Sequence, residues 1–349
     1  MKYISFFFLP TLVFCFDKWI VVTSIQYPTP QLEKLAKIPG WHLLVVGDKK
    51  TPKDWHLAHC EYLSPDDQLR LGYKSATALP WNHYSRKNIG YLYAISKGAK
   101  IIYETDDDNE PINELSAYDC ETSLHSINTL ETCFNIYRYF DCPEVWPRGY
   151  PLDKIRSSSA FSISLLSNCI IGVEQGIVND SPDVDAIFRL TQDRYIKFND
   201  YPPIFLPEGV FCPFNSQNTF IHPVAFFTLY LPSSVSMRIS DIWRGYITQK
   251  LLWAHNAKLV FSAPNAVQKR NAHSLLQDFQ LELDLYLKTP ALIDFLSNFH
   301  FPPDLDPCQE LVSIYEELVA RKFIQQSEMP ILEAWVEDLQ AIRDSFFID

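Results

Sequence analysis

The stretch IIYETDDD at residues 101–108 decides how this chain of 349 residues is interpreted. A short apolar segment leads into three consecutive carboxylates, Asp106, Asp107 and Asp108, and a helical pattern from Ser85 to Lys97 comes before it. Like charges within a few Å repel one another, so the run needs either a bound cation or full solvation. The sequence therefore predicts a buried strand that ends in a cation site or in an exposed acidic turn.

Apolar segments alternate with helical ones along the first hundred residues. Residues 19–24 and 42–47 are almost wholly apolar, which is typical of parallel strands covered on both faces. Thr29-Pro30 and Ser64-Pro65 are typical of helix starts. This alternation predicts an α/β fold with a mostly parallel central sheet flanked by helices. Ligands of such sheets bind beyond the carboxyl ends of the strands, which is where we expect the acidic run.

The chain divides into three predicted segments. Residues 1–16 resemble a signal peptide or anchor, because they are apolar but too short to span a bilayer as a helix; the alternative is a buried N-terminal strand. Residues 17–264 form the α/β domain, with irregular patterning from about 110 to 235. Helical periodicity returns from Ser240, and residues 265–349 are expected to be a helical C-terminal extension.

Composition and motifs exclude several functions. The formal net charge of -12 makes a nucleic-acid backbone a poor partner. The chain has no GxxxxGK[ST], HExxH or GxSxG pattern, which argues against P-loop ATPases, zincins and α/β-hydrolases. The eight cysteines include no CxxC pair, so a zinc ribbon is not expected.

The candidate site residues begin with the acidic run. Hard divalent cations prefer oxygen ligands, so two of its carboxylates are candidates to hold Mg²⁺ or Mn²⁺. Arg86, Lys87 and Asn88 open the helix before it, where the macrodipole disfavours cations. They are expected to face a ligand phosphate or the acidic run, unless they form a solvated basic turn.

Two further residues have a functional and a structural interpretation. Asp241 follows Ser240 at an expected helix start, where a cap explains it fully. In its functional interpretation, Asp241 is the base that deprotonates an acceptor hydroxyl. His222 is a candidate third metal ligand, and its alternative is a histidine satisfied within a loop.

Read together, these segments resemble the STELLO family of glycosyltransferases. The resemblance covers about residues 19–265 and, more weakly, the helical tail. Plant members carry a long cytosolic and transmembrane N-terminus and a second glycosyltransferase-like half, so this chain is expected to correspond to the first half only. The runs that carry the resemblance include Trp19–Thr23, Lys37–Trp41, Thr51–Trp55, Arg86–Ile95, Val145–Gly149, Gln175–Ile177, Pro182–Asp185, Arg244–Tyr246 and Leu251–Trp253.

The resemblance implies a GT-A-like, Rossmann-like fold and a metal-dependent glycosyltransferase. It implies a UDP-type nucleotide-sugar donor, a glycan or other hydroxyl acceptor, and inverting transfer of a hexosyl or pentosyl group. Other glycosyltransferases are expected partners. The expected setting is the secretory pathway or Golgi lumen, or secretion; a cytoplasmic setting follows if the leader is a core strand.

The site roles then follow by position. Asp106 and Asp108 are expected to hold the metal, with Asp107 near the ribose or the metal. Arg86, Lys87 and Asn88 are expected on the donor side. A more distant likeness to the reversibly glycosylated polypeptides aligns all three aspartates and places a carboxylate at Asp241, which favours the role of base over the cap.

Two questions stay open at this point. The acidic motif of the STELLO family resembles Asp-Ala-Asp-Asp, which falls on residues 104–107, so Glu104 and Asp108 compete for one place in the site. The alternative functions are a non-catalytic glycosyltransferase-like scaffold that organises other polysaccharide-synthesising enzymes, and a metal-dependent phosphoesterase. The second alternative is disfavoured because no histidine-rich metal shell accompanies the run.

Overall fold

The structure is a computed structural model that describes residues 17–112, 114–157, 159–192, 194–268 and 274–345. The expected signal-like or anchor segment 1–16 lies outside the described residues. Among the described residues, no helix combines the length and apolar character that a bilayer crossing requires.

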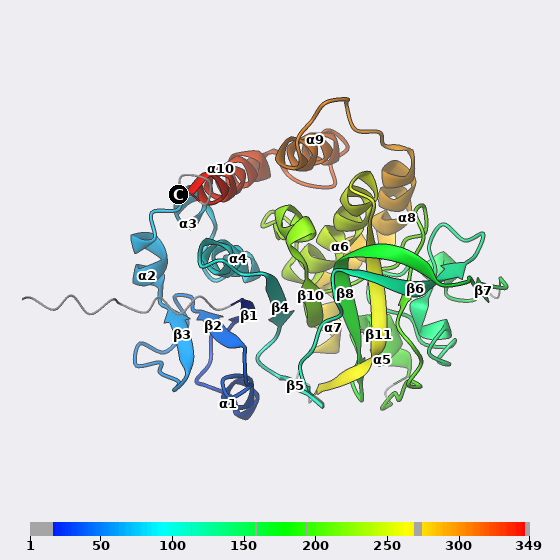
Figure 1. The fold of residues 1–349 in the computed structure, drawn as a ribbon, viewed down its shortest axis with the longest axis horizontal. Coiled ribbons are helices and arrows are strands. Elements are labelled where there is room, and N and C mark those ends of the chain that lie inside the picture. Colours follow the sequence, from blue (N-terminus) through cyan, green and yellow to red (C-terminus); the bar gives the residue numbers. More distant parts are fainter. Residues whose placement is uncertain (1–16, 113, 158, 193, 269–273, 346–349) are drawn as a thin grey trace, which may run out of the picture.

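Four parallel strands form the first half of a large sheet, in the order β3-β2-β1-β4 (Figure 1). The apolar runs of three of these strands, β1, β2 and β4, predicted this part, whereas β3 was not predicted. The strands are β1 (Lys18–Thr23), β2 (His42–Val46), β3 (Cys60–Leu63) and β4 (Ile101–Thr105). The helices between them are α1 (Pro30–Leu35), α2 (Pro65–Arg70), α3 (Lys74–Ala78) and α4 (Lys87–Ser96), which follows a 3₁₀ turn at Tyr84–Arg86.

Beyond β4 the sheet becomes mixed. β10 (Asn218–Ile221) runs antiparallel to both β4 and β8, and β8 runs parallel to β11. The α/β class is therefore confirmed, with parallel strands concentrated at the N-terminal side. The other strands are β5 (Asn109–Pro111), β6 (Glu121–Asn128), β7 (Ser162–Ile163), β8 (Ser167–Asn179), β9 (Ile204–Phe205) and β11 (Ala257–Gln268).

Helices cover the sheet on both faces. The remaining helices are α5 (Ala186–Thr191), α6 (Met237–Ala254), α7 (Leu275–Leu281), α8 (Leu283–Asn298), α9 (Pro307–Ala320) and α10 (Met329–Ser345). Short 3₁₀ turns lie at Ile136–Arg138, Leu152–Lys154, Pro223–Thr228 and Gln326–Glu328. α4 lies so close to β1 and β2 that a Cβ on Gly90 would come within 2.7 Å of the Val21 and Val46 side chains.

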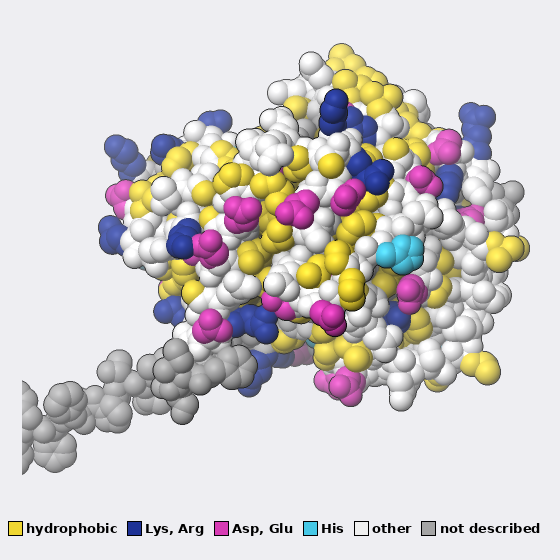
Figure 2. Space-filling model, turned by 90° about the horizontal axis from the view of Figure 1, so that it is seen from above, with side chains coloured by type: hydrophobic (Ala, Val, Ile, Leu, Met, Phe, Trp, Pro, Cys, Tyr) yellow, Lys and Arg dark blue, Asp and Glu magenta, His cyan; other side chains and the backbone are white. Residues whose placement is uncertain are grey.

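The outer helices α9 and α10 are amphipathic. The apolar side of α10, which includes Leu332, Trp335 and Leu339, is buried in the main core. The face that looks upward in Figure 1 carries acidic and basic side chains interspersed with apolar ones (Figure 2). These helices therefore turn their apolar sides inward and leave a mixed surface to solvent.

The predicted domain boundary at 264/265 falls inside a strand. β11 runs through it, from Ala257 to Gln268, and its last three residues pair with β5. The helices that follow share the core of the α/β part, since Trp335 lies against Tyr230 with ring centroids 5.6 Å apart. Residues beyond 264 therefore complete the domain rather than extend it.

An expected stability change tests this integration. α3 has no capping side chain of its own, and Asp338 of α10 supplies it by accepting from Lys74 N at 2.9 Å and from Ser75 N at 2.8 Å. We expect Asp338→Ala to lower the free energy of unfolding by about 2 kcal/mol, because it leaves these donors without a partner. Urea denaturation measures the loss. Asp344→Ala, at an exposed position of the same helix, is the control; an equal result for both variants would contradict the account.

Candidate active site

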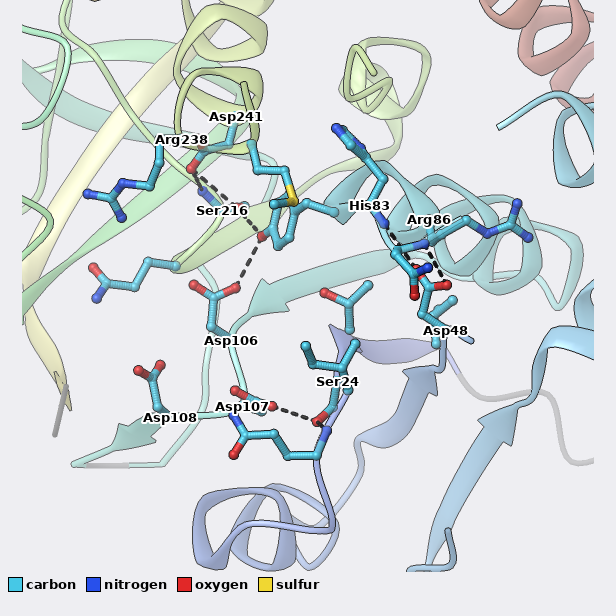
Figure 3. Close-up of a pocket in the computed structure, with 18 of the residues that line it drawn as sticks. Ser24, Asp48, His83, Arg86, Asp106, Asp107, Asp108, Ser216, Arg238 and Asp241 are labelled. Atoms are coloured by element: carbon cyan, nitrogen blue, oxygen red, sulfur yellow. Dashed lines mark hydrogen bonds between the residues drawn. The ribbon is translucent and has the colours of Figure 1, made fainter. Parts of the chain in front are cut away.

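A cavity of about 580 Å³ lies at the carboxyl ends of the parallel strands (Figure 3). One wall comes from the loops after β1, β2 and β4, which contribute Ser24, Asp48 and the acidic run. The opposite wall comes from the start of α6 and from loops of the second half of the sheet. Its members include Arg148, Asp183, Arg189, Ser216, Arg238 and Asp241.

The three aspartates of the acidic run all line this cavity, and they have different partners. Asp107 accepts a hydrogen bond of 2.6 Å from Ser24 Oγ, which follows β1. The two carboxylate oxygens of Asp108 lie 3.1 and 3.2 Å from Gln268 Nε2 at the end of β11. Asp106 accepts from the Tyr84 hydroxyl at 3.1 Å. The run is therefore held by β1, β4 and β11 together.

Asp106 has a strongly perturbed carboxyl group. Burial raises its pKa to about 7; Lys87 opposes this shift, while Asp108, Asp241 and Asp107 add to it. The side chain is nevertheless 36% exposed, because it faces the cavity. Repulsion from nearby carboxylates would be relieved by a cation, so the site is electrostatically prepared to take one.

The donor set fits a hard cation that also binds phosphate. Within the described ranges, no group of three or more His, Cys, Asp or Glu side chains could hold a metal ion by itself. Mg²⁺ commonly uses one or two carboxylates together with substrate phosphates and water. Asp106 and Asp108 line one cavity and meet that requirement, whereas a site made wholly of protein ligands does not fit.

Arg86, Lys87 and Asn88, which open α4, have three different sets of contacts. Lys87 is buried and lies 3.5 Å from Asp106 Oδ1, so it faces the acidic run, which was one of its two expected positions. Arg86 lines the cavity, but neither its guanidinium group nor the Asn88 amide is directed at the acidic run. Arg86 points away from the aspartates and donates to Gln68 Oε1 (Figure 3). Asn88 is buried and bonds both backbone groups of Leu231.

The structure does not bring His222, the predicted third metal ligand, to the acidic run. β10 is antiparallel to β4, so Asn218 pairs with Thr105 while Ile221 pairs with Ile102. His222 follows Ile221 and therefore lies at the opposite end of the sheet from Asp106. Burial lowers its pKa to about 4.

Glu104, which competed with Asp108 for a place in the site, is directed elsewhere. It is fully buried and forms an ion pair with Arg244 of α6, with Arg244 Nη1 and Glu104 Oε2 2.8 Å apart. The Tyr91 hydroxyl also donates to it. Of the two possible registers, the structure brings only residues 106–108 to the cavity.

Asp241 is not a helix cap. α6 begins at Met237 with Ser236 as its cap, which places Asp241 in the second turn, facing the cavity. Arg148 contacts both of its carboxylate oxygens, at 3.2 Å and 2.9 Å. Asp241 and Asp106, from opposite walls, are thus brought to one cavity (Figure 3).

Arg148 joins two carboxylates. Besides Asp241, it binds Asp183 through Nε at 2.8 Å and Nη2 at 2.7 Å. Burial would raise the pKa of Asp183, but the Arg148 guanidinium holds it below its ordinary value. The three groups form a buried, bidentate ion-pair network that fixes the orientation of Asp241.

Sequence reasoning did not assign Arg148, Asp183, Ser24, Tyr84 or Ser216 to the site. The loops that contain Arg148 and Asp183, Val145–Gly149 and Pro182–Asp185, stood out only as runs that carry the family resemblance. The sequence did show an arginine in one loop and an aspartate in the other. Nothing in their spacing indicated that the two side chains form an ion pair.

The raised pKa of Asp106 gives an expected pH dependence. Its folded-state pKa of about 7 lies above the ordinary value of 3.8, so the penalty for ionisation is present above pH 7 and disappears as the pH falls toward 4. We expect Asp106→Asn to raise the melting temperature of the metal-free protein by about 2–4 °C at pH 8 and by clearly less at pH 5. Differential scanning calorimetry measures this, with the exposed Asp66→Asn as control. The same gain at both pH values would contradict the assignment.

Comparisons with known proteins agree with this architecture. A family model described as STELLO glycosyltransferases matches residues 238–348, from the start of α6 through α10. Two Arabidopsis thaliana proteins are similar over nearly the whole chain. "Probable glycosyltransferase STELLO1" is 34% identical over 354 residues, and "Probable glycosyltransferase STELLO2" is 33% identical over 350 residues.

Each alignment covers 93% of this chain and 44% of the relative, so the chain spans less than half the length of these relatives. The family model includes Arg238 and Asp241 of the cavity and the helices that complete the domain. The α/β sheet, consistent with a GT-A-like fold, and the family comparisons lead to one assignment: the chain belongs to the STELLO family of glycosyltransferases.

Proposed function

We propose that this chain transfers a sugar from a UDP-type nucleotide sugar to a hydroxyl group of a glycan or other acceptor, with inversion at the anomeric carbon. The observation that carries the proposal is the shared cavity of Asp106 and Asp241. One carboxylate belongs to the acidic run at a strand end, and the other is fixed by Arg148 on the facing wall.

The donor nucleoside is assigned to the cavity wall formed after β1 and β2. Asp48 organises this wall, since it accepts hydrogen bonds from the backbone N–H groups of Asn82 at 2.8 Å and His83 at 3.1 Å. Ser24 and Gln26 supply further polar groups beside it. Ligands of parallel α/β sheets bind beyond these strand ends, which supports a position of the diphosphate next to the acidic run.

Asp106 and Asp108 would hold a divalent cation, Mn²⁺ or Mg²⁺, together with the diphosphate. When bound, such a cation stabilises the negative charge of the departing diphosphate. Lys87 adds a fixed positive charge behind Asp106, at 3.5 Å. Its ammonium group is held by Thr105 O at 2.9 Å, so it limits repulsion within the run without entering the cavity.

Asp241 is proposed as the base. Its carboxylate accepts the proton of the acceptor hydroxyl while that oxygen forms a bond to the anomeric carbon. The bond from this carbon to the diphosphate breaks, and the diphosphate leaves with the electron pair. A base on the wall opposite the leaving group favours attack from the far side, which gives inversion. Asp241 Oδ1 keeps a lone pair beyond its contact with Arg148, whereas Oδ2 also faces Ser216.

A donor screen tests the proposal. Purified protein with Mn²⁺ is incubated with individual nucleotide sugars and a panel of oligosaccharide acceptors, and release of the nucleoside diphosphate and formation of product are measured. We expect one UDP-sugar to give product that EDTA abolishes. The absence of both transfer and donor hydrolysis, with donors that do bind, would favour the scaffold function instead.

A further inference from the structure

A chain of hydrogen bonds joins the two carboxylates across the cavity (Figure 3). The Tyr84 hydroxyl lies 3.1 Å from Asp106 Oδ1, and it is also hydrogen-bonded to Ser216 Oγ. Ser216 Oγ lies 3.4 Å from Asp241 Oδ2. Lys87 Nζ donates to the Tyr84 oxygen at 2.9 Å. Two side-chain hydroxyls are therefore all that separates the proposed cation ligand from the proposed base.

Counting protons shows that this chain has two arrangements. Each hydroxyl has one proton to donate, and one lone pair of Tyr84 is already used by Lys87. In the first arrangement, Ser216 donates to Tyr84 and Tyr84 donates to Asp106. In the second, Tyr84 donates to Ser216 and Ser216 donates to Asp241. Rotation of both hydroxyls interconverts the two without moving a heavy atom.

We propose that the hydroxyls of Tyr84 and Ser216 form a reversible pair, which donates either toward Asp106 or toward Asp241 and thereby couples cation–diphosphate binding to the base. This inference rests on the proposed function. Tyr84 and Ser216 are positioning residues, because they act through the two aspartates.

The coupling has a definite direction. Before the cation binds, both carboxylates compete for the pair. A cation on Asp106 supplies the positive charge that this carboxylate needs, and the pair turns to Asp241, a charged and therefore strong acceptor. Binding of the cation–diphosphate thus orients the base, which favours donor binding before acceptor binding.

Binding measurements test the coupling without any assay of activity. Mn²⁺-dependent binding of UDP is measured calorimetrically for the wild type, Asp241→Asn, Ser216→Ala and the double variant. Asparagine is a weaker acceptor for the pair, so Asp241→Asn should weaken binding in the wild type. In the Ser216→Ala background only the through-space effect of the lost charge is left. The factor by which Asp241→Asn raises the dissociation constant of UDP should therefore be about fivefold smaller there.

Tyr84→Phe, which removes a single oxygen atom, should reduce the effect of Asp241→Asn in the same way. Ser240→Ala is the matched control: its hydroxyl is buried beside Asp241 and donates to Pro232 O at 2.7 Å, outside the chain. The full effect should persist in that background. If Asp241→Asn weakens the binding of UDP equally in all backgrounds, the proposed coupling through Tyr84 and Ser216 is overturned.

The outcome for the pair can be separated from that of the proposed function. If the wild type binds no Mn²⁺ and UDP, the proposed function fails. The pair is then decided by denaturation of Tyr84→Phe, Ser216→Ala and their double variant. One connected chain predicts that the double variant loses clearly less stability than the sum of the single losses. Stability losses that add up in the double variant would refute the connected chain of hydrogen bonds.

Discussion

Asp241→Asn is expected to lower the turnover number for sugar transfer by about 10²–10⁴-fold at saturating donor and metal, the range typical of a lost general base. An amide of the same shape cannot accept the proton of the acceptor hydroxyl. Donor binding should change far less than turnover, because Asp241 lies on the wall opposite the acidic run. Initial rates of nucleotide release with acceptor present measure the effect.

The fold should survive this substitution, which makes the result interpretable. Arg148 keeps its bidentate contact with Asp183, so no buried charge loses every partner. The melting temperature and circular dichroism spectrum of the variant verify this. Transfer at the wild-type rate by a folded Asp241→Asn protein would remove Asp241 from the mechanism.

Arg244→Leu is expected to lower the free energy of unfolding by about 3–5 kcal/mol. The substitution leaves Glu104 fully buried without its cation, and removing one partner of a buried ion pair has this large cost. Chemical denaturation measures it. The prediction also tests the assignment of Glu104 to the core instead of the cavity.

The double variant Glu104→Gln/Arg244→Leu supplies the matched comparison. It removes both charges together, so it should recover a large part of the stability that Arg244→Leu loses, and Tyr91 still has an acceptor in the glutamine side chain. A double variant as unstable as the sum of the two single variants would show that Glu104 and Arg244 do not act as a pair.

The sequence predicted the first half of the sheet well and the second half poorly, for a physical reason. β1 and β2 are continuous apolar runs, and Pro30 and Pro65 mark the helices between the strands. β8 instead carries buried polar residues whose partners are distant, such as Gln175, which donates to Asn218 O at 3.0 Å.

β11 contains Pro264, the last residue of the predicted α/β domain. In the structure this proline lies where the pairing with β8 shifts register, between Ser262 and Ala266. Proline is tolerated at such irregularities, because its missing N–H is not needed in the ladder there. Local composition therefore pointed to a break at a position where the sheet continues.

The same limit applies to the candidate site. Carboxylates at a strand end are placed by the topology, so Asp106, Asp107 and Asp108 reached the cavity as expected. The direction of a helical side chain is set by tertiary packing, so Arg86 and Asn88 could not be told apart from residues that face a ligand. Nothing in the sequence places His222 relative to the run, because the antiparallel direction of β10 was not predicted.

The most direct test of the central claim is the calorimetric titration of UDP into the protein with and without Mn²⁺. The account predicts binding with Mn²⁺ that weakens at least about tenfold without it, a difference of about 1.4 kcal/mol. Asp106→Asn and Asp108→Asn should each remove the dependence on Mn²⁺, while Asp66→Asn should bind as the wild type does. Binding of UDP that is the same with and without Mn²⁺, and unchanged by Asp106→Asn, would contradict the claim that the acidic run holds a cation and a diphosphate.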